Sequence, residues 1–279
     1  MMPHRILIAV ALAAFAPASM ANIIASDDFS YPLGELTGQN GGTGWGVNTW
    51  TAVTSITQVV DPAVDLSGDR AAQFTGNNNN AAYRRLASPF LGNQLFVHFL
   101  IQVDNGALAA NDFLALWLDT VTTGDHTARP NIGIKADRGG SASCTGSNCD
   151  DVFVRTSGTA GNYVPSSNIA STNDVTHEIV GLLSRSAPGN YTRFDVWLDP
   201  LVGDLSTPEA TFTGNAGISQ IEYVGFRSAN LDGGDVVLID DLRLATTWDE
   251  ALGVPEPTSV ALLGLGLAGL GLARRRRKG

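Results

Sequence analysis

Short runs in which apolar residues alternate with other residues recur along this chain, and they constrain its fold more than any other feature. In residues 95–103, one face of an extended strand would carry Leu, Val, Phe, Ile and Val, and the other Phe, His, Leu and Gln. Turn-forming residues separate such runs at intervals of about ten residues, and no convincing helical period appears. The clearest predicted strands are residues 95–103, 112–119, 131–137, 151–156, 175–183, 191–199, 220–228 and 235–244.

This pattern predicts an all-β fold, a two-sheet antiparallel β-sandwich built as one domain over residues 22–250. A parallel α/β fold would need long helical crossovers between its strands, and the pattern does not supply them. The two faces of residues 95–103 differ, so we expect one core side and one partly solvent-exposed side. The asparagine run at 77–80 and the glycine-rich residues 38–46 are interpreted as loops.

The N-terminus has the layout of a secretory signal peptide over residues 1–21. Arg5 supplies a positive start, residues 6–15 are apolar, and small residues precede a cleavage site after Ala21. Pro17 and the small residues end the apolar run too early for a packed helix of the folded domain. We therefore expect export from the cytoplasm.

The C-terminus has the layout of a short membrane anchor. A linker at residues 251–258 carries Pro255-Glu256-Pro257, and residues 259–273 are almost entirely Ala, Leu, Gly and Val. As a helix this segment would reach about 22 Å, short of a hydrocarbon core of about 30 Å, so we expect a marginal transmembrane helix. The basic tail at residues 274–279 would stop the helix and stay cytoplasmic. Its four arginines are Arg274, Arg275, Arg276 and Arg277.

These C-terminal residues resemble the PEP-CTERM sorting tail of Gram-negative bacteria, in which a Pro-Glu-Pro motif, a short apolar helix and an Arg-rich end follow one another. The resemblance implies that Pro255, Glu256 and Pro257 are a recognition signal for an exosortase, a membrane protease, and not catalytic residues. It also implies a precursor anchored in the inner membrane, then a place on the cell surface or in an extracellular polysaccharide matrix. A plain anchor behind a stiff linker is the alternative.

The net charge of the chain restricts the kinds of partner that it is expected to bind. The whole chain has a net charge of −10; without Arg5 and the five basic tail residues, 11 basic residues face the 27 acidic ones, a balance of −16. Such a chain lacks the basic footprint of a nucleic-acid-binding protein. It suits an extracellular protein that takes up divalent cations, and calcium is the expected ion. The candidate calcium ligands are Asp232, Asp235, Asp240 and Asp241.

The chain has two cysteines, Cys144 and Cys149, which are separated by four residues. In an oxidising compartment we expect them to form a local disulfide that pins a surface loop. The spacing excludes a C-x-x-C redox site, and no histidine lies nearby in sequence to complete a zinc site.

The two ends of the body resemble the first and last strands of concanavalin A-like and laminin G-like jelly rolls of exported bacterial proteins. The resemblance is carried by Ser26-Asp27-Asp28-Phe29-Ser30-Tyr31 and by Ile239-Asp240-Asp241-Leu242-Arg243-Leu244-Ala245-Thr246-Thr247-Trp248. It covers residues 25–250 and implies that the first and last strands pair.

No catalytic motif is found. Glycoside hydrolases on this fold place two carboxylates on one strand face, and the nearest acidic pieces here are His177-Glu178 and the pair Asp195 and Asp199. There is no G-x-S-x-G elbow. His98, His126 and His177 lack the spacing of metal ligands and are read as sheet or loop residues.

Sugar binding needs exposed aromatic rings beside polar neighbours. The candidates are Trp197, with Arg193 and Asp195, and Trp117 beside Asp119; the alternative is that each tryptophan belongs to the core. The first hypothesis is thus a non-catalytic, surface-sorted sandwich that binds glycan. A carbohydrate-active hydrolase or lyase and a purely structural matrix protein are the two alternatives.

Overall fold

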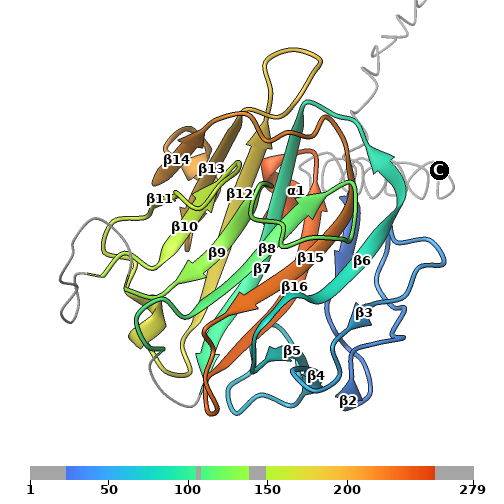
Figure 1. Ribbon diagram of the computed structural model, residues 1–279, viewed down its shortest axis with the longest axis vertical. Coiled ribbons are helices and arrows are strands. Elements are labelled where there is room, and N and C mark those ends of the chain that lie inside the picture. Colours follow the sequence, from blue (N-terminus) through green and yellow to red (C-terminus); the bar gives the residue numbers. More distant parts are fainter. Residues whose placement is uncertain (1–22, 105–107, 138–148, 255–279) are drawn as a thin grey trace, which may run out of the picture. The chain divides into compact units, whose positions relative to one another are not determined.

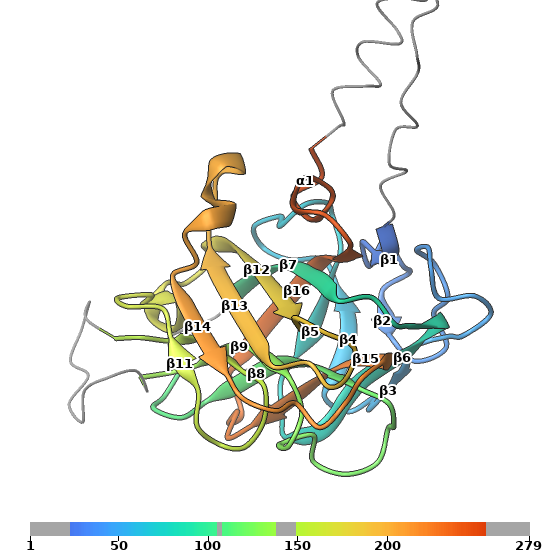
Figure 2. The ribbon, with the colours of Figure 1, turned by 90° about the horizontal axis from the view of Figure 1, so that it is seen from above.

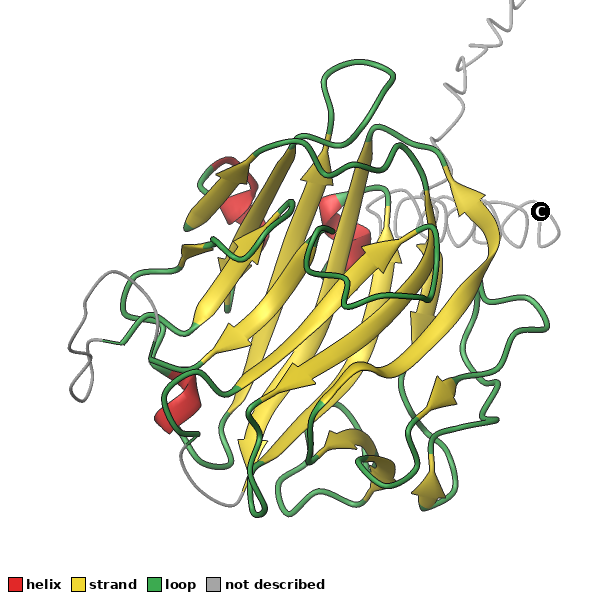
Figure 3. Ribbon diagram, viewed as in Figure 1, coloured by secondary structure: helices red, strands yellow, loops and turns green. Residues whose placement is uncertain are grey.

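The computed structural model describes residues 23–104, 108–137 and 149–254, which build two antiparallel sheets packed face to face (Figures 1 and 3). One compact unit spans Asn22–Val254, four residues beyond the predicted end of the body. No helix within the described part is both long and apolar enough to cross a membrane. The signal peptide, the Pro-Glu-Pro motif and the anchor at 259–273 lie outside the described residues.

The first sheet has nine strands, and all of its neighbouring strands run antiparallel. Its order is β14 (Ala210–Thr213), β13 (Arg193–Leu198), β12 (Thr176–Ser184), β7 (Gln94–Asp104), β16 (Val236–Ala245), β5 (Ala71–Phe74), β4 (Thr57–Val60) and β2 (Gly34–Glu35), while β1 (Ile23–Asp27) pairs with β16. The pairing of β1 with β16 aligns Asp27 with Leu242, so the prediction that first and last strands pair is confirmed.

The second sheet has seven strands and faces the viewer in Figure 1. Its order is β11 (Asn162–Tyr163), β10 (Val152–Arg155), β9 (Asn131–Lys135), β8 (Phe113–Asp119), β15 (Ile221–Ala229), β6 (Asn78–Phe90) and β3 (Thr51–Ala52). The predicted all-β sandwich of the jelly-roll kind is confirmed, and each of the eight predicted strands matches an observed one. One loop prediction is wrong, because Asn78, Asn79 and Asn80 begin β6 instead of lying in a loop.

The main core lies between the two sheets, where inward side chains alternate with outward ones. In β7 the inward set Leu95, Val97, Phe99, Ile101 and Val103 joins this core as its sequence pattern predicts. The outer side of β7 is also largely buried, with Leu100 half-buried, which corrects the expected partly solvent-exposed face. Phe96 packs against Trp248, and His98 and Gln102 are at most 2% exposed.

Two short helices cover that outer side of the nine-stranded sheet. They are η2 (Val202–Ser206), after β13, and α1 (Trp248–Ala251), after β16; a third short helix, η1 (Ile169–Ser171), precedes β12. The Trp248 indole lies 5.0 Å from that of Trp197 and donates a hydrogen bond to the Val202 carbonyl. Both η2 and α1 therefore sit on the side opposite the seven-stranded sheet (Figure 2).

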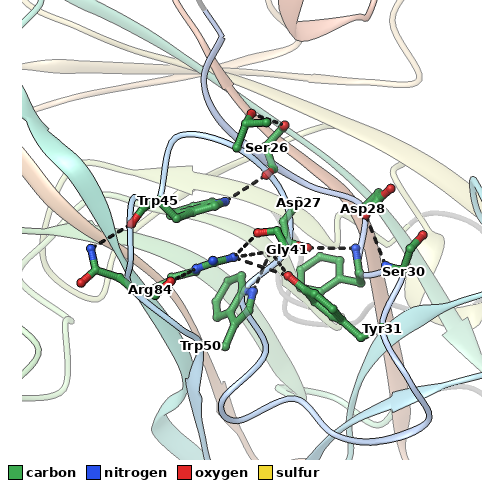
Figure 4. Close-up of polar contacts among 12 residues, drawn as sticks. Ser26, Asp27, Asp28, Ser30, Tyr31, Gly41, Trp45, Trp50 and Arg84 are labelled. Atoms are coloured by element: carbon green, nitrogen blue, oxygen red, sulfur yellow. Dashed lines mark hydrogen bonds and ion pairs between the residues drawn. The ribbon is translucent and has the colours of Figure 1, made fainter.

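A buried ion pair links the two sheets near the start of the body (Figure 4). A carboxylate oxygen of Asp27, at the end of β1, lies 2.7 Å from Nη1 of Arg84 in β6, and both side chains are fully buried. The same oxygen accepts hydrogen bonds from the Tyr31 hydroxyl at 2.6 Å and the Trp50 indole at 2.8 Å. Burial raises the pKa of Tyr31, and the neighbouring Asp27 carboxylate adds to that rise. We call these four residues the Asp27–Arg84 clamp.

Candidate functional site

The outer face of the seven-stranded sheet carries two hollows lined by aromatic and arginine side chains. Successive residues of a strand point to opposite faces, so the core positions Leu114, Leu116 and Val224 leave their neighbours pointing outward. The outward residues of β8, β10 and β15 include Phe113, Trp117, Phe153, Arg155, Tyr223 and Arg227. Topology thus gathers onto one face side chains that are far apart in sequence.

The first hollow, the tyrosine pocket, has a volume of about 390 Å³ and is lined by Val47, Asn48, Thr49, Thr51, Tyr83, Arg84, Arg85 and Tyr223. The half-buried rings of Tyr83 and Tyr223 lie 6.5 Å apart with an interplanar angle of 74°. The guanidinium of Arg85 lies over the Tyr223 ring at 5.7 Å and contacts Glu222 at 3.2 Å. This hollow combines aromatic surface with hydroxyl, amide and guanidinium groups.

The second hollow, the arginine pocket, has a volume of about 150 Å³ and is lined by Asn111, Phe113, Thr127, Lys135, Arg155, Thr159, Arg227, Ala229 and Asn230. Two guanidinium groups share one ring: the Cζ atoms of Arg155 and Arg227 lie 5.6 Å and 5.0 Å from the centre of Phe113. Arg155 also lies 5.3 Å from the ring centre of Phe153. Such contacts attract a cation to the face of a ring.

Among the described residues, the two arginines of this pocket have few hydrogen-bond partners, and none of these partners is acidic. Arg155 donates from Nη2 to the side-chain oxygen of Asn131 at 3.2 Å and from Nη1 to the Thr159 carbonyl at 3.5 Å. Arg227 donates from Nη2 to the side-chain oxygen of Asn79 at 3.0 Å. The Nε atoms of both arginines are buried without a partner, and no carboxylate of the described residues lies within 4 Å of either guanidinium.

Burial and one more distant acid, Asp125, set the electrostatics of the arginine pocket. Burial lowers the pKa of Arg155 to about 10, and the neighbouring Arg227 lowers it further while Tyr163 and Asp125 oppose the shift. Burial likewise lowers the pKa of Arg227, with Asp125 opposing. Both groups remain cationic at neutral pH, so the pocket holds two positive charges that repel each other.

A second polar network, the His126 network, holds the loop beside the arginine pocket. Asp119 accepts hydrogen bonds from Arg129 Nε at 2.8 Å and lies 2.9 Å from Nδ1 of His126. Burial raises the pKa of Asp119, but the hydrogen bonds from His126, Thr120 and Arg129 outweigh it and hold that pKa below its ordinary value. Asn131 donates to the His126 carbonyl and accepts from Arg155, so it connects the network to the pocket.

Trp117, expected as an exposed sugar platform, is instead fully buried, and that expectation is wrong. Its indole stacks on the His126 ring at 3.7 Å with an interplanar angle of 1°, so the loop covers it. Gly225 on the adjacent strand makes room for it, because a Cβ there would approach the indole to 2.4 Å. The ring positions the loop and offers no face to a ligand.

Trp197, the other expected platform, is 2% exposed and likewise cannot stack on a sugar. It packs on Trp248, and its indole donates a hydrogen bond to the Asp204 carbonyl. Its expected polar neighbours are nearby but paired with each other, since Arg193 Nε lies 2.8 Å from a carboxylate oxygen of Asp195. The helices η2 and α1 cover the face on which these residues lie.

The four aspartates expected to bind calcium do not converge. Asp240 accepts hydrogen bonds from the backbone and hydroxyl of Ser67, whereas Asp241 pairs with Arg243. Asp235 accepts from the backbone NH of Asp232. In the described ranges, no group of three or more His, Cys, Asp or Glu side chains is arranged to hold a metal ion. Calcium binding therefore remains a prediction, and the four aspartates do not form a shared set of ligands for it.

The expected disulfide also stays a prediction. Cys149 is buried at the edge of the described residues, and Cys144 lies outside them.

One arrangement of side chains resembles the catalytic triad that the hydrolase alternative would need. It consists of Thr172 as the nucleophile, His177 as the base and Asp199 as the acid. His177 Nδ1 lies 2.8 Å from Asp199, and its Nε2 lies 3.3 Å from the Thr172 hydroxyl. That hydroxyl, however, donates its hydrogen to the Ile169 carbonyl at 2.8 Å, so it does not offer a proton to the histidine. The arrangement anchors the segment before β12 and is not a hydrolase triad.

Sequence reasoning missed both pocket arginines. A usable signal existed, because Phe153 and Arg155 stand two residues apart in a strand and so share a face, as do Tyr223 and Gly225 with Arg227. The convergence of β10, β8 and β15 is a property of strand order, which that signal does not contain.

Comparison with known families supports the assignment of the C-terminal sorting motif. Residues 253–278 match the PEP-CTERM protein-sorting motif, as their resemblance predicted. The motif implies export, sorting to the cell surface and processing by an exosortase, which is a membrane protein. No curated protein sequence matches the chain.

Several solved structures resemble the body at low identity. A botulinum neurotoxin serotype G binding domain matches with a TM-score of 0.47 and 12% identity, covering 82% of this chain and 50% of that one. The T. cruzi calreticulin globular domain matches with a TM-score of 0.44 and 10% identity, covering 81% of this chain and 95% of that one. The CBM22-1 xylan-binding domain from Paenibacillus barcinonensis Xyn10C matches with a TM-score of 0.36 and 12% identity over 82% and 96%. The chain therefore spans about half the length of the toxin domain.

Proposed function

We propose that this chain is an exported, surface-sorted protein whose β-sandwich binds glycan without catalysing a reaction. The sorting motif at residues 253–278 supports the route to the surface, with an exosortase as the processing partner. The outer face of the seven-stranded sheet supplies the binding surface. An extracellular polysaccharide is the proposed ligand, and the cell surface or the matrix around it is the proposed place of action.

The tyrosine pocket carries this proposal. A sugar ring has apolar faces that stack on aromatic side chains and a rim of hydroxyls that need hydrogen-bond partners. Tyr83 and Tyr223 offer half-buried rings, and Asn48, Thr49 and Arg85 offer polar groups in the same hollow. Its volume of about 390 Å³ lies within the range of small-ligand sites.

The position of the two pockets suits a chain of sugars. Tyr223 and Arg227 point outward from the same strand, four residues apart, which corresponds to about 13 Å. An oligosaccharide that stacks on Tyr223 would therefore reach the arginine pocket. The stack of His126 on Trp117 lies beside Gly225, midway between Tyr223 and Arg227, so the oligosaccharide would have to pass over this loop.

The lining of the two pockets supports binding over hydrolysis. Glycoside hydrolysis uses two carboxylates about 5 to 10 Å apart on either side of the scissile bond. Among the described residues that line the two pockets, none is Asp or Glu. Glu222, beside the tyrosine pocket, is engaged with Arg85.

The test is a glycan-array screen of the full chain in mild detergent, comparing the unchanged protein with Tyr223→Ala and Tyr223→Phe. We expect binding to at least one glycan, loss on Tyr223→Ala, and retention in Tyr223→Phe, which keeps the ring. Leu201→Ala, an exposed apolar residue beside η2, is the matched control and should bind normally. No binding to any glycan would contradict the proposal and favour a structural matrix role.

A further inference from the structure

The arginine pocket contains two cations, the buried Arg155 and the half-buried Arg227, and no carboxylate of the described residues lies within 4 Å of either. We propose that this pocket binds the oxyanion of an acidic glycan residue, a carboxylate or a sulfate ester. The inference rests on the proposed glycan-binding function and adds to it the chemical class of the ligand. It concerns Arg155 and Arg227, whereas the proposed function rests on Tyr83 and Tyr223.

Burial is the first argument. Arg155 is only 4% exposed, and its Nε is buried without a hydrogen-bond partner although the side chain lines the pocket. Charged side chains are rarely buried in proteins unless they are paired. Because that Nε is sealed from solvent, an anion in the hollow would compensate the charge of this guanidinium without bonding to Nε.

The convergence of two guanidinium groups is the second argument. Arg155 and Arg227 both lie over Phe113, and each lowers the stability of the other's charge, which is why Arg227 lowers the pKa of Arg155. An anion placed between these groups would relieve their repulsion, and guanidinium groups match carboxylate and sulfate oxygens geometrically.

The behaviour of the other arginines is the third argument. Six described arginines contact a carboxylate within 4 Å, and they are Arg70, Arg84, Arg85, Arg129, Arg193 and Arg243. Arg185 donates to backbone carbonyls instead. Acids are abundant in a chain with a net charge of −10, yet among the described residues no carboxylate lies within 4 Å of the two arginines on Phe113, and Asp125 acts on both from farther away.

The size of the pocket indicates what part of a ligand it takes. At about 150 Å³ it is smaller than the usual range for a whole small-molecule site, so it suits a substituent of a larger ligand. A sugar stacked at the tyrosine pocket would leave the acidic group of a later residue to enter the arginine pocket.

The test compares matched ligands by calorimetry of the full chain in mild detergent at fixed salt concentration. The ligands are oligogalacturonate and the same oligomer with its carboxyls reduced to alcohols, with sulfated and unsulfated dextran oligomers as the second pair. We expect at least about tenfold tighter binding of the acidic member of one pair or the other, and which pair responds identifies the carboxylate or the sulfate.

Variants decide whether the pocket is responsible. Arg155→Met and Arg227→Met keep an apolar stem against Phe113 and should each remove most of the preference for the acidic oligomer while leaving binding of the neutral one unchanged. Arg193→Met, an arginine on the other sheet, is the control for lost positive charge. Circular dichroism confirms that each variant is folded.

Two outcomes overturn the inference and are distinct from failure of the proposed function. Equal affinity for acidic and neutral oligomers, still lost on Tyr223→Ala, would leave glycan binding in place and refute the oxyanion site. A preference for acidic oligomers that survives in Arg155→Met and Arg227→Met would place the charge recognition elsewhere.

Discussion

Two buried arginines of this protein are held in opposite ways. Arg84, in the Asp27–Arg84 clamp, lies 2.7 Å from a carboxylate with both side chains fully buried. Arg155, in the arginine pocket, is 4% exposed and has no carboxylate partner among the described residues. Both guanidinium groups lie over aromatic rings, so aromatic contact does not separate them.

This difference suggests how to distinguish a buried charge that stabilises the fold from a buried charge that is available to bind a ligand. In the buried pair of Asp27 and Arg84 each charge is compensated by the other, although Nη2 of Arg84 is buried without a hydrogen-bond partner. Removing one member of such a pair leaves an uncompensated charge. A buried cation that lies near the surface and has no acidic partner keeps an uncompensated charge, and an anionic ligand would compensate it. The predictions below test this contrast.

The largest effect is expected at the clamp. Asp27→Asn replaces a carboxylate oxygen that accepts hydrogen bonds from Tyr31, Trp50 and Arg84, and it leaves the arginine buried and unpaired. We expect a loss of about 3 to 5 kcal/mol in the free energy of unfolding. Urea denaturation followed by tryptophan fluorescence measures it. Asp69→Asn, at a largely exposed carboxylate, should change stability by less than about 0.5 kcal/mol.

A carboxylate introduced beside Arg227 should form an ion pair in the arginine pocket, as Asp27 does with Arg84. Asn79 accepts a hydrogen bond from Arg227 at 3.0 Å, so Asn79→Asp would place a carboxylate there. We expect about tenfold weaker binding of the acidic oligomer, because the protein would then neutralise its own arginine. Asn77→Asp adds the same charge at an exposed position and is the control. Equal weakening in both variants would point to general repulsion instead.

Removal of the two arginines should have unequal effects on stability. Arg84→Met leaves Asp27 buried without a cation, whereas Arg155→Met leaves no acid behind and adds an apolar side chain against two phenylalanines. We expect a loss of several kcal/mol for the first and a change within about 1 kcal/mol, in either direction, for the second. Thermal denaturation of the full chain compares them. Equal losses would mean that Arg155 is as structural as Arg84.

The contrast also extends to an acid that lacks a cation. Burial raises the pKa of Asp112 to about 6, the backbone NH of Ala109 opposes the rise, and Asp235 and Asp232 add to it. Between about pH 4 and pH 6 the folded state then binds more protons than the unfolded one, so this group's contribution to stability falls as pH rises through that window. Asp112→Asn should flatten the stability profile there, as measured by urea denaturation across pH. An unchanged profile would refute the shift.

Much of the fold follows from the sequence because strand patterns are local. The alternation in residues 95–103 and 191–199 predicts both the strands and which side chains enter the core, and the structure agrees. The sorting motif is equally local, since a contiguous segment carries it.

The site was less predictable because it depends on strand order and on what covers each face. Trp117 and Trp197 have the pattern of outward-facing rings, and they do face outward, but a loop and two short helices cover them. The arginine pocket joins residues from β8, β10 and β15, and the clamp joins Asp27 to Arg84 across 57 positions. No single-strand pattern encodes such neighbours.

The contrast between arginines with and without a carboxylate partner is most directly measured by NMR of the arginine Nε–H groups during titration with oligogalacturonate. We predict that the Nε signals of Arg155 and Arg227 move with added ligand, because an anion in the arginine pocket would change the electrostatic environment of both guanidinium groups. The signal of Arg243, on the other sheet, should stay fixed, because its Nε already donates to Asp241 at 2.9 Å. Signals of Arg155 and Arg227 that remain unmoved while glycan binds would contradict the account.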